Sequence, residues 1–339
     1  MDGTSSSPPS SRMEPVHPDR VTSPRGAASP RRWLLVATLC LIAAAPLPAY
    51  APPGFDTGRA SLRVSVGDTE ITYNVFAVSV LPQEVVSLRL HPPADPDSFQ
   101  VICDPPVRRD TSGGGWAWRA PLKHGLSVLR IADTAAGDTM TLNIFTLVPA
   151  ASVKKGVLNG VRIGSYPSSG QSPRPPRGFI EVTRENALTQ VSPHFTIGQF
   201  LAKKEGGFPR YMVLDADLLL HLEGLLEAVN RRGHTASTFA ILSGYRTPHY
   251  NRQQGNVRRS QHLYGSAADI FIDESPRDDV MDDLNGDGVS DRRDAVVLSA
   301  IVDSLEASGG TPGGMSTYPA NDSHGPFIHV DVRGNRVRW

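Results

Sequence analysis

The stretch SQHLYGSAADIFID, Ser260 to Asp273, decides the fold of the C-terminal half of the chain. It places an imidazole, His262, and a carboxylate, Asp269, seven positions apart around a glycine and several small residues. Its end, AADIFID, is a short apolar run and predicts a strand. The spacing alone fits two surface groups near a turn as well as two metal ligands that need a third.

Helical and extended patterns alternate around this stretch. Apolar residues at helical spacing predict helices, and short apolar runs that enter turns predict strands. The predicted helices cover 215–233 and 295–305, and the predicted strands cover 238–246 and 326–334. Helices beside an antiparallel-looking sheet predict an α+β domain over residues 179–339, with a small antiparallel sheet.

The preceding part of the chain has a different pattern. Residues 52–150 contain short apolar–polar alternations, such as the pair around Gly67 and Asp68 that predicts a hairpin. Several such strands without helical periods predict an all-β sandwich of immunoglobulin-like type. Residues 151–178 are rich in Pro, Ser and Gly, and we expect a linker there between the two domains.

The first 51 residues have the pattern of a leader that is removed. Residues 1 to about 30 are Ser, Pro and Arg rich and predict disorder. Arg31-Arg32, the apolar run 33–45 and Ala49-Tyr50-Ala51 then form the three parts of a signal peptide. We therefore expect an exported protein of the periplasm or cell envelope with no stable membrane span after cleavage. An uncleaved signal would instead anchor the protein.

Charge and cysteine content exclude two further classes. The 339 residues carry 34 Lys+Arg and 34 Asp+Glu, and no basic run stands out, so we expect no nucleic-acid partner. Only Cys40 and Cys103 occur, and Cys40 lies inside the predicted signal. The exported chain then has no intramolecular disulfide, and its stability depends on its core, on metals or on both.

A third candidate ligand comes from the predicted closing strand. His329 and Asp331 alternate with Ile328 and Val330, so the strand period places both polar side chains on one face. A catalytic zinc takes three protein ligands and a water, and His and Asp are suitable donors where Cys is absent. His262, Asp269 and His329 are therefore a candidate zinc set.

Three segments resemble the zinc D-alanyl-D-alanine peptidases of the M15 type. The segments are SGYRTPHYN (243–251), SQHLYGSAADI (260–270) and HVDVRG (329–334). The family pattern Ser-x-His-x-x-Gly-x-Ala-x-Asp is matched at Ser260, His262, Gly265, Ala267 and Asp269. The family contains cell-wall carboxypeptidases and endopeptidases, and its fold is related to that of the hedgehog signalling domain. The resemblance covers roughly residues 179–339.

The resemblance implies a hydrolase, a metallopeptidase acting on peptidoglycan peptides. His262, Asp269 and His329 would be the zinc ligands. Arg246 would lie by the metal and meet the substrate or the developing oxyanion, where a guanidinium stabilises negative charge.

The general base departs from the family pattern. The family takes it from a Glu three residues, or a His two residues, before the last His, and here Pro326 and Phe327 stand there. Asp331 is the first candidate base and His324 the second, although either could instead orient a ligand. A zinc-bearing peptidoglycan-binding or regulatory module without catalysis is the alternative function.

A second metal motif lies between two of the candidate zinc ligands. DLNGDGVSDRRD, residues 283–294, fits a twelve-position calcium loop and resembles the calcium loops of dockerin modules. The expected ligands are Asp283, Asn285, Asp287, Val289 through its carbonyl, Asp291 through water, and Asp294. We expect a structural calcium there. The alternative is a solvated acidic loop in which Asp283 or Asp291 caps the next helix.

Overall fold

The structure is a computed structural model that describes residues 54–91, 96–110, 115–167, 173–203 and 206–339. All of these described residues belong to one compact unit. The predicted leader and signal peptide, residues 1–51, lie outside the described residues. Within the described ranges, no helix has both the length and the apolar character that crossing a membrane requires.

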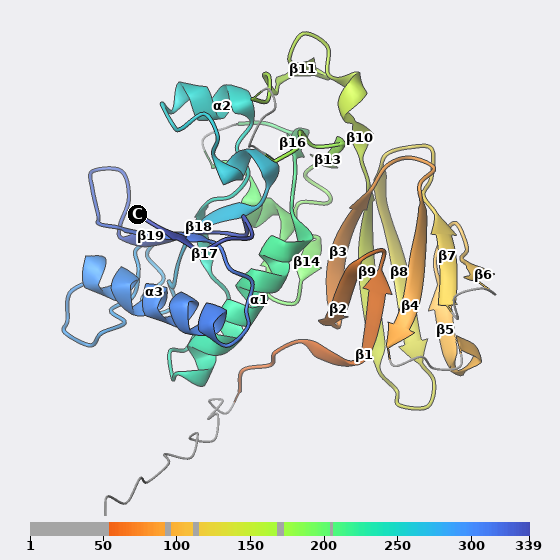
Figure 1. The fold of residues 1–339 in the computed structure, drawn as a ribbon, viewed down its shortest axis with the longest axis horizontal. Coiled ribbons are helices and arrows are strands. Elements are labelled where there is room, and N and C mark those ends of the chain that lie inside the picture. The colour runs from red at the N-terminus through yellow and green to blue at the C-terminus, as the bar shows by residue number, and fades with distance from the viewer. Residues whose placement is uncertain (1–53, 92–95, 111–114, 168–172, 204–205) are drawn as a thin grey trace, which may run out of the picture. The chain divides into compact units, whose positions relative to one another are not determined.

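The N-terminal part is built from two sheets, as the alternating pattern predicts (Figure 1). The five-stranded sheet has the order β2-β1-β4-β7-β6, and the four-stranded sheet has the order β3-β9-β8-β5. The strands are β1 Arg59–Val66, β2 Thr69–Tyr73, β3 Val75–Val80, β4 Val85–His91, β5 Phe99–Ile102, β6 Arg108–Asp110, β7 Gly115–Arg119, β8 Gly125–Asp133 and β9 Thr139–Thr146. A short 3-10 helix, Pro96–Ser98, precedes β5. The immunoglobulin-like type stays a prediction.

Trp118 on β7 is fully buried in the apolar core, and its indole N–H donates to the carbonyl of Pro105 at 2.9 Å. We expect Trp118→Ala to lower the free energy of unfolding by about 3–5 kcal/mol, because truncating a buried aromatic leaves a cavity. Urea denaturation followed by circular dichroism measures this. Leu122→Ala, at a position that is 78% exposed, is the control and should change little. Equal stability of the two variants would contradict this placement.

Short elements connect the two parts. Strands β10 Val148–Pro149, β13 Gly178–Val182 and β16 Arg210–Met212 form a three-stranded sheet. Within the predicted linker, β11 Val157–Leu158 and β12 Val161–Arg162 form a hairpin that follows the 3-10 helix Ala150–Ser152. Strands β14 Gln190–Ser192 and β15 Phe195–Thr196 pair before the 3-10 helix Ile197–Phe200. The division into domains at 151–178 stays a prediction.

The C-terminal part is α+β, as predicted. Its sheet has the order β17-β18-β20-β19-β21, antiparallel except for the β19–β21 pair at one edge. The strands are β17 Ala240–Ser243, β18 Ala267–Phe271, β19 Gly314–Tyr318, β20 Phe327–Asp331 and β21 Val337–Arg338. The helices are α1 Ala216–Arg231, α2 Pro248–Gln253 and α3 Arg292–Ala307, with the 3-10 helix η4 at Gln261–Tyr264. Helix α3 packs on β19 and β20, and α1 packs on α3.

Both long helices begin at an aspartate. The Asp215 side chain accepts a hydrogen bond from the backbone N–H of Asp217 at the start of α1. At the start of α3, Asp291 is the N-cap. The Asp294 side chain accepts a hydrogen bond from the backbone N–H of Asp291, which completes a capping box. The apolar stripe predicted on α1 is buried, and the helix packs against α3 and β14.

Candidate metal centre

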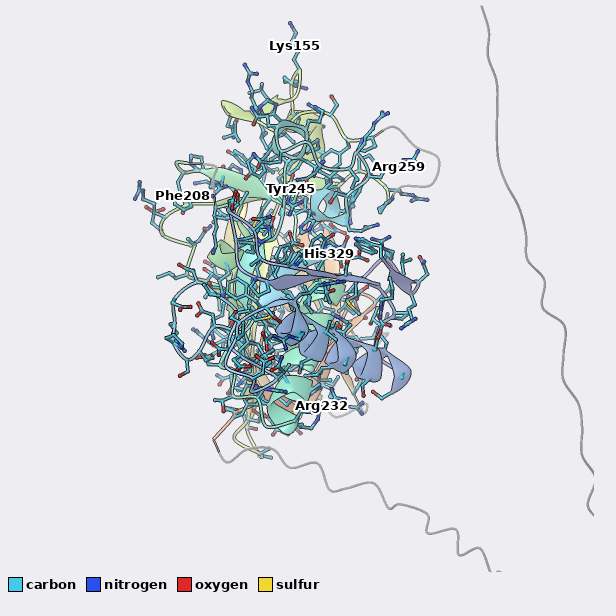
Figure 2. All side chains as sticks on the ribbon, turned by 90° about the vertical axis from the view of Figure 1, so that its left-hand side faces the viewer. Lys155, Phe208, Arg232, Tyr245, Arg259 and His329 are labelled. Atoms are coloured by element: carbon cyan, nitrogen blue, oxygen red, sulfur yellow. The ribbon has the colours of Figure 1, made fainter. Side chains whose placement is uncertain are left out.

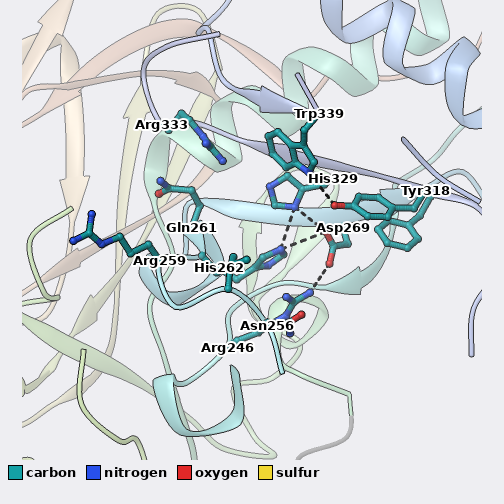
Figure 3. Close-up of a pocket in the computed structure, with 13 residues that line it drawn as sticks. Arg246, Asn256, Arg259, Gln261, His262, Asp269, Tyr318, His329, Arg333 and Trp339 are labelled. Atoms are coloured by element: carbon teal, nitrogen blue, oxygen red, sulfur yellow. Dashed lines mark hydrogen bonds and ion pairs between the residues drawn. The ribbon is translucent and has the colours of Figure 1, made fainter. Parts of the chain in front are cut away.

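The sheet register brings two of the predicted ligands together. Asp269 on β18 lies directly opposite His329 on β20, in the middle of an antiparallel pair. His262 reaches the same point from η4, immediately before β18 (Figure 3). All three side chains are buried, and one donor atom from each lies within 4.8 Å of the other two. No other group of His, Cys, Asp or Glu of this kind occurs in the part of the chain that the structure describes.

The small residues of the opening stretch allow a close chain crossing. Gly265 ends η4 with a φ of +69°, which favours glycine. A Cβ there would lie 2.2 Å from the carbonyl oxygen of Val213, so the position has no room for a side chain. The Gly265 carbonyl accepts from the backbone N–H of Asp215, the cap of α1. This crossing fixes His262 against the start of β18.

Hydrogen bonds set the tautomers of the two histidines. A backbone carbonyl can only accept, so His262 donates from Nδ1 to the oxygen of Gly244 at 2.6 Å. His329 donates from Nε2 to Asp331 at 3.1 Å. The other two ring nitrogens, His262 Nε2 and His329 Nδ1, lie 3.2 Å apart. They face Asp269 Oδ1 at 3.3 and 2.9 Å.

Two nitrogen lone pairs and a carboxylate therefore converge on one point, which favours a positive charge between them. Burial alone would lower the pKa of His329, but its hydrogen bonds to Asp269 and Asp331 outweigh this and raise the pKa to about 9, so without a metal Nδ1 carries a proton that a bound cation would displace. Burial lowers the pKa of His262 and favours its neutral, coordinating form. Two imidazoles and a carboxylate are a donor set that suits zinc, so these residues fit the metal that the sequence predicts.

Arg246 lies beside the three candidate ligands, in the turn after β17. Its Nη2 donates to Asp269 Oδ2 at 2.5 Å and its Nε donates to Ser243 at 2.8 Å. Its backbone N–H donates to the carbonyl of His262, which ties this turn to η4. Burial alone would raise the pKa of Asp269, but His262 and His329 hold it well below the ordinary value. Asp269 is therefore a permanent carboxylate at this site.

Asp331, the first candidate base, is almost fully buried and its oxygens are occupied. They accept from His329 Nε2, from Arg333 Nε at 2.8 Å and from the backbone N–H of Gly314 at 2.9 Å. Burial alone would raise the pKa of Asp331, but the bonds from His329 and Arg333 lower it well below the ordinary value. This geometry is that of a carboxylate that orients a ligating imidazole.

Asp331→Asn should weaken zinc binding about tenfold to a hundredfold, because a neutral amide holds the His329 ring less firmly. Competition with a chromogenic chelator measures the zinc affinity directly. Asp303→Asn is the matched control, since Asp303 pairs with Arg336 and Arg338 instead of a candidate ligand. Unchanged zinc affinity combined with lost hydrolysis would assign Asp331 to proton transfer instead.

The candidate ligands line a cavity of about 430 Å³. Its wall also contains Arg333, Tyr318 and Trp339, which were not among the residues predicted from the sequence (Figure 3). The Trp339 ring lies 5.3 Å from that of His329, and its indole N–H donates to the Tyr318 hydroxyl at 3.0 Å. Arg333 follows His329 and Asp331 at the two-residue period of a strand, so this spacing could have indicated that Arg333 lies on the same face. No sequence signal marks Trp339.

A second cavity of about 720 Å³ adjoins the first, and the two share Arg246, Asp269, Tyr318 and Phe327 among their lining residues. His324, the second candidate base, lines this second cavity. Its ring packs edge-on against Phe327, and its Nε2 lies 2.8 Å from the amide nitrogen of Asn321. The structure thus places His324 along the cleft but not among the three converging donors.

The acidic loop 283–294 is closed by backbone hydrogen bonds. Asp283 accepts from the N–H groups of Gly286 and Gly288 at 2.8 and 2.6 Å. Asp294 is buried and accepts from the N–H groups of Leu284 and Asp291, both at 2.8 Å. Arg293 pairs with Asp287 and Asp291. Asp291 therefore has the capping role that the sequence left open as the alternative.

Comparison with known families supports the same chemistry. Residues 201–292 match the family model of Peptidase M15. The matched segment contains Arg246, His262 and Asp269, and it ends before His329. No curated protein matches the chain. Over this segment the chain is similar to the M15 peptidases, which are zinc-dependent metallopeptidases that act on peptide substrates.

Proposed function

We propose that the chain is an exported zinc metallopeptidase that hydrolyses peptide bonds in the stem peptides of bacterial cell-wall peptidoglycan. The activity is either that of a D-Ala-D-Ala carboxypeptidase or that of a cross-link endopeptidase. The observation that carries this proposal is the convergence of His262 Nε2, Asp269 and His329 Nδ1 within one cleft. The family match over residues 201–292 supports it.

The residues of the cleft have separate roles in this proposal. His262, Asp269 and His329 hold zinc, which when bound lowers the pKa of a water and polarises a carbonyl. Arg246 lines both cavities and stabilises negative charge on the oxygen of the attacked carbonyl. Asp331 and Arg333 hold the His329 ring in its coordinating tautomer.

His324 is the proton-transfer residue in this proposal. The oxygens of Asp331 already accept hydrogen bonds from three donors, so Asp331 is a positioning residue. His324 lines the cavity that shares Asp269 and Arg246 with the metal cleft, and an imidazole nitrogen can accept and donate a proton. We expect His324→Ala to keep zinc and to lose most hydrolysis.

Digestion of purified peptidoglycan followed by mass spectrometry tests the function. The wild-type chain should create new stem-peptide ends, and His262→Ala should create none. A loss of the terminal residue identifies a carboxypeptidase, and the appearance of separated stems identifies an endopeptidase. Unchanged muropeptides would contradict the proposal.

The alternative is a zinc-bearing peptidoglycan-binding or regulatory module without catalysis. One observation favours it: among the described residues that line the metal cavity, Asp269 is the only carboxylate and the two ligands are the only imidazoles. Retained zinc and retained binding to peptidoglycan, with no new ends in the digest, would select this alternative.

We propose, from the sequence pattern, that the loop 283–294 binds a structural calcium. Calcium should then raise the melting temperature, because a ligand that binds only the folded state stabilises it. Differential scanning calorimetry with calcium and with chelator measures the effect, and Asp283→Asn should remove it. No response to calcium would reduce this loop to a capped helix start.

A further inference from the structure

A basic pocket lies beside the β11–β12 hairpin, outside the metal cleft. It has a volume of about 400 Å³, and Lys155, Arg162, His249 and Arg252 line it. A neighbouring cavity of about 320 Å³ shares Arg252 with it and adds Arg258. Among the described residues, no Asp or Glu lines either cavity. The chain as a whole has equal numbers of basic and acidic residues, so this concentration of positive charge is local.

The cations of this pocket have no acidic partner in the part of the chain that the structure describes. Within the described ranges, none of Lys155, Arg162, Arg252 and Arg258 forms an ion pair, whereas Arg336 and Arg338 both pair with Asp303. Positive side chains that face one cavity repel one another, and an anion bound between them removes that repulsion. The pocket is therefore suited to a ligand with more than one negative charge.

The backbone around the pocket is tightly built. Ile163 and Gly164 both donate to the carbonyl of Gly156 at 2.9 Å, and the His249 N–H donates to the carbonyl of Ile163 at 2.9 Å. A Cβ on Gly164 would lie 2.8 Å from the His249 nitrogen and 3.0 Å from Arg252 Nη2. Gly164 thus lets Arg252 lie against the hairpin that carries Arg162. Lys155, which precedes β11, also lines the pocket, and it extends away from the body of the protein (Figure 2).

We propose that this pocket binds a phosphate group, with Arg162 and Arg252 as its main ligands. A guanidinium presents paired N–H donors that match phosphate oxygens, and a phosphate carries enough charge to offset several cations. The phosphate can belong to a free compound or to a phospholipid headgroup. Helix α2 lies between this basic pocket and the metal cleft. His249 and Arg252 of α2 line the basic pocket, and Tyr250 of α2 lines the second cavity, which adjoins the metal cleft.

Titration of the full chain with inorganic phosphate at low ionic strength, followed by calorimetry, tests the proposal. Arg162→Gln and Arg252→Gln should each weaken binding about tenfold, since each removes a charge-assisted contact. Arg130→Gln is the control, because Arg130 is exposed on β8 and also forms no ion pair in the described ranges. Arg162 lies on the exposed hairpin, so its replacement keeps the test valid if Arg252→Gln fails to fold.

The metal site is the competing place for an anion, and His262→Ala separates the two. Phosphate binding that survives His262→Ala and is weakened by Arg162→Gln supports the basic pocket. Binding that is lost in His262→Ala but unchanged in Arg162→Gln overturns the proposal, as does no binding at all. Co-sedimentation with vesicles that contain phosphatidic acid, compared with neutral vesicles, distinguishes a lipid headgroup from a free phosphate, and Arg162→Gln should weaken this binding to the same extent.

Discussion

Replacing His262 with Ala should remove stoichiometric zinc and all detectable peptidoglycan hydrolysis. His262 is buried and contributes one of three converging donor atoms, so its loss leaves two protein ligands where a catalytic zinc needs three. We expect the zinc content to fall from about one per chain to near zero by atomic emission analysis. Hydrolysis should fall at least about a thousandfold, because a metal held by these residues would both activate a water and polarise the carbonyl.

The matched control is His324→Ala. His324 lines the adjoining cavity but is not among the three donors, so this variant should keep its zinc while it loses hydrolysis. The two variants together separate metal binding from proton transfer. Full zinc occupancy in His262→Ala would contradict the ligand assignment, whatever the activity.

Replacing Arg246 with Gln should lower kcat/KM about a hundredfold or more without removing zinc. The guanidinium donates hydrogen bonds to Asp269 and Ser243 and lines both cavities. It can therefore contact a substrate oxygen that gains negative charge. Loss of one such donor costs roughly a hundredfold to a thousandfold in rate. Most of the loss should lie in kcat, because the interaction strengthens in the transition state.

Arg336→Gln serves as the control for Arg246→Gln. It removes the same charge from a mostly exposed pair with Asp303, and activity should stay within error of the wild type. Arg246→Lys keeps a positive charge without the paired donors, and we expect an intermediate rate. Wild-type kcat in Arg246→Gln would show that the guanidinium only holds Asp269 in place.

Local pattern was enough to predict which three candidate ligands the structure brings close together. The strand period placed His329 and Asp331 on one face, and Ser-x-His-x-x-Gly-x-Ala-x-Asp selected His262 and Asp269. The structure adds the reason for the spacing: Gly265 packs against the backbone of Val213, and the β18–β20 register sets Asp269 opposite His329.

Other features depend on contacts between distant segments, which a sequence period does not carry. Trp339 lies in the wall of the cleft because β21, which precedes it, pairs in parallel with β19. Arg333 contributes to the site because its guanidinium donates a hydrogen bond to Asp331. The hairpin inside the predicted linker rests on Gly156 and Gly164, in a stretch whose composition favours loops. The proposed calcium ligands rest on a sequence template, and in the structure its last positions, Asp291 and Asp294, form a capping box.

Anomalous diffraction at the zinc absorption edge tests the central claim most directly. Crystals of the zinc-loaded chain should show one strong peak about 2.0–2.2 Å from His262 Nε2, an oxygen of Asp269 and His329 Nδ1. The peak should be absent from His262→Ala crystals. A zinc peak held by other residues, or no peak between these three side chains, would contradict the account.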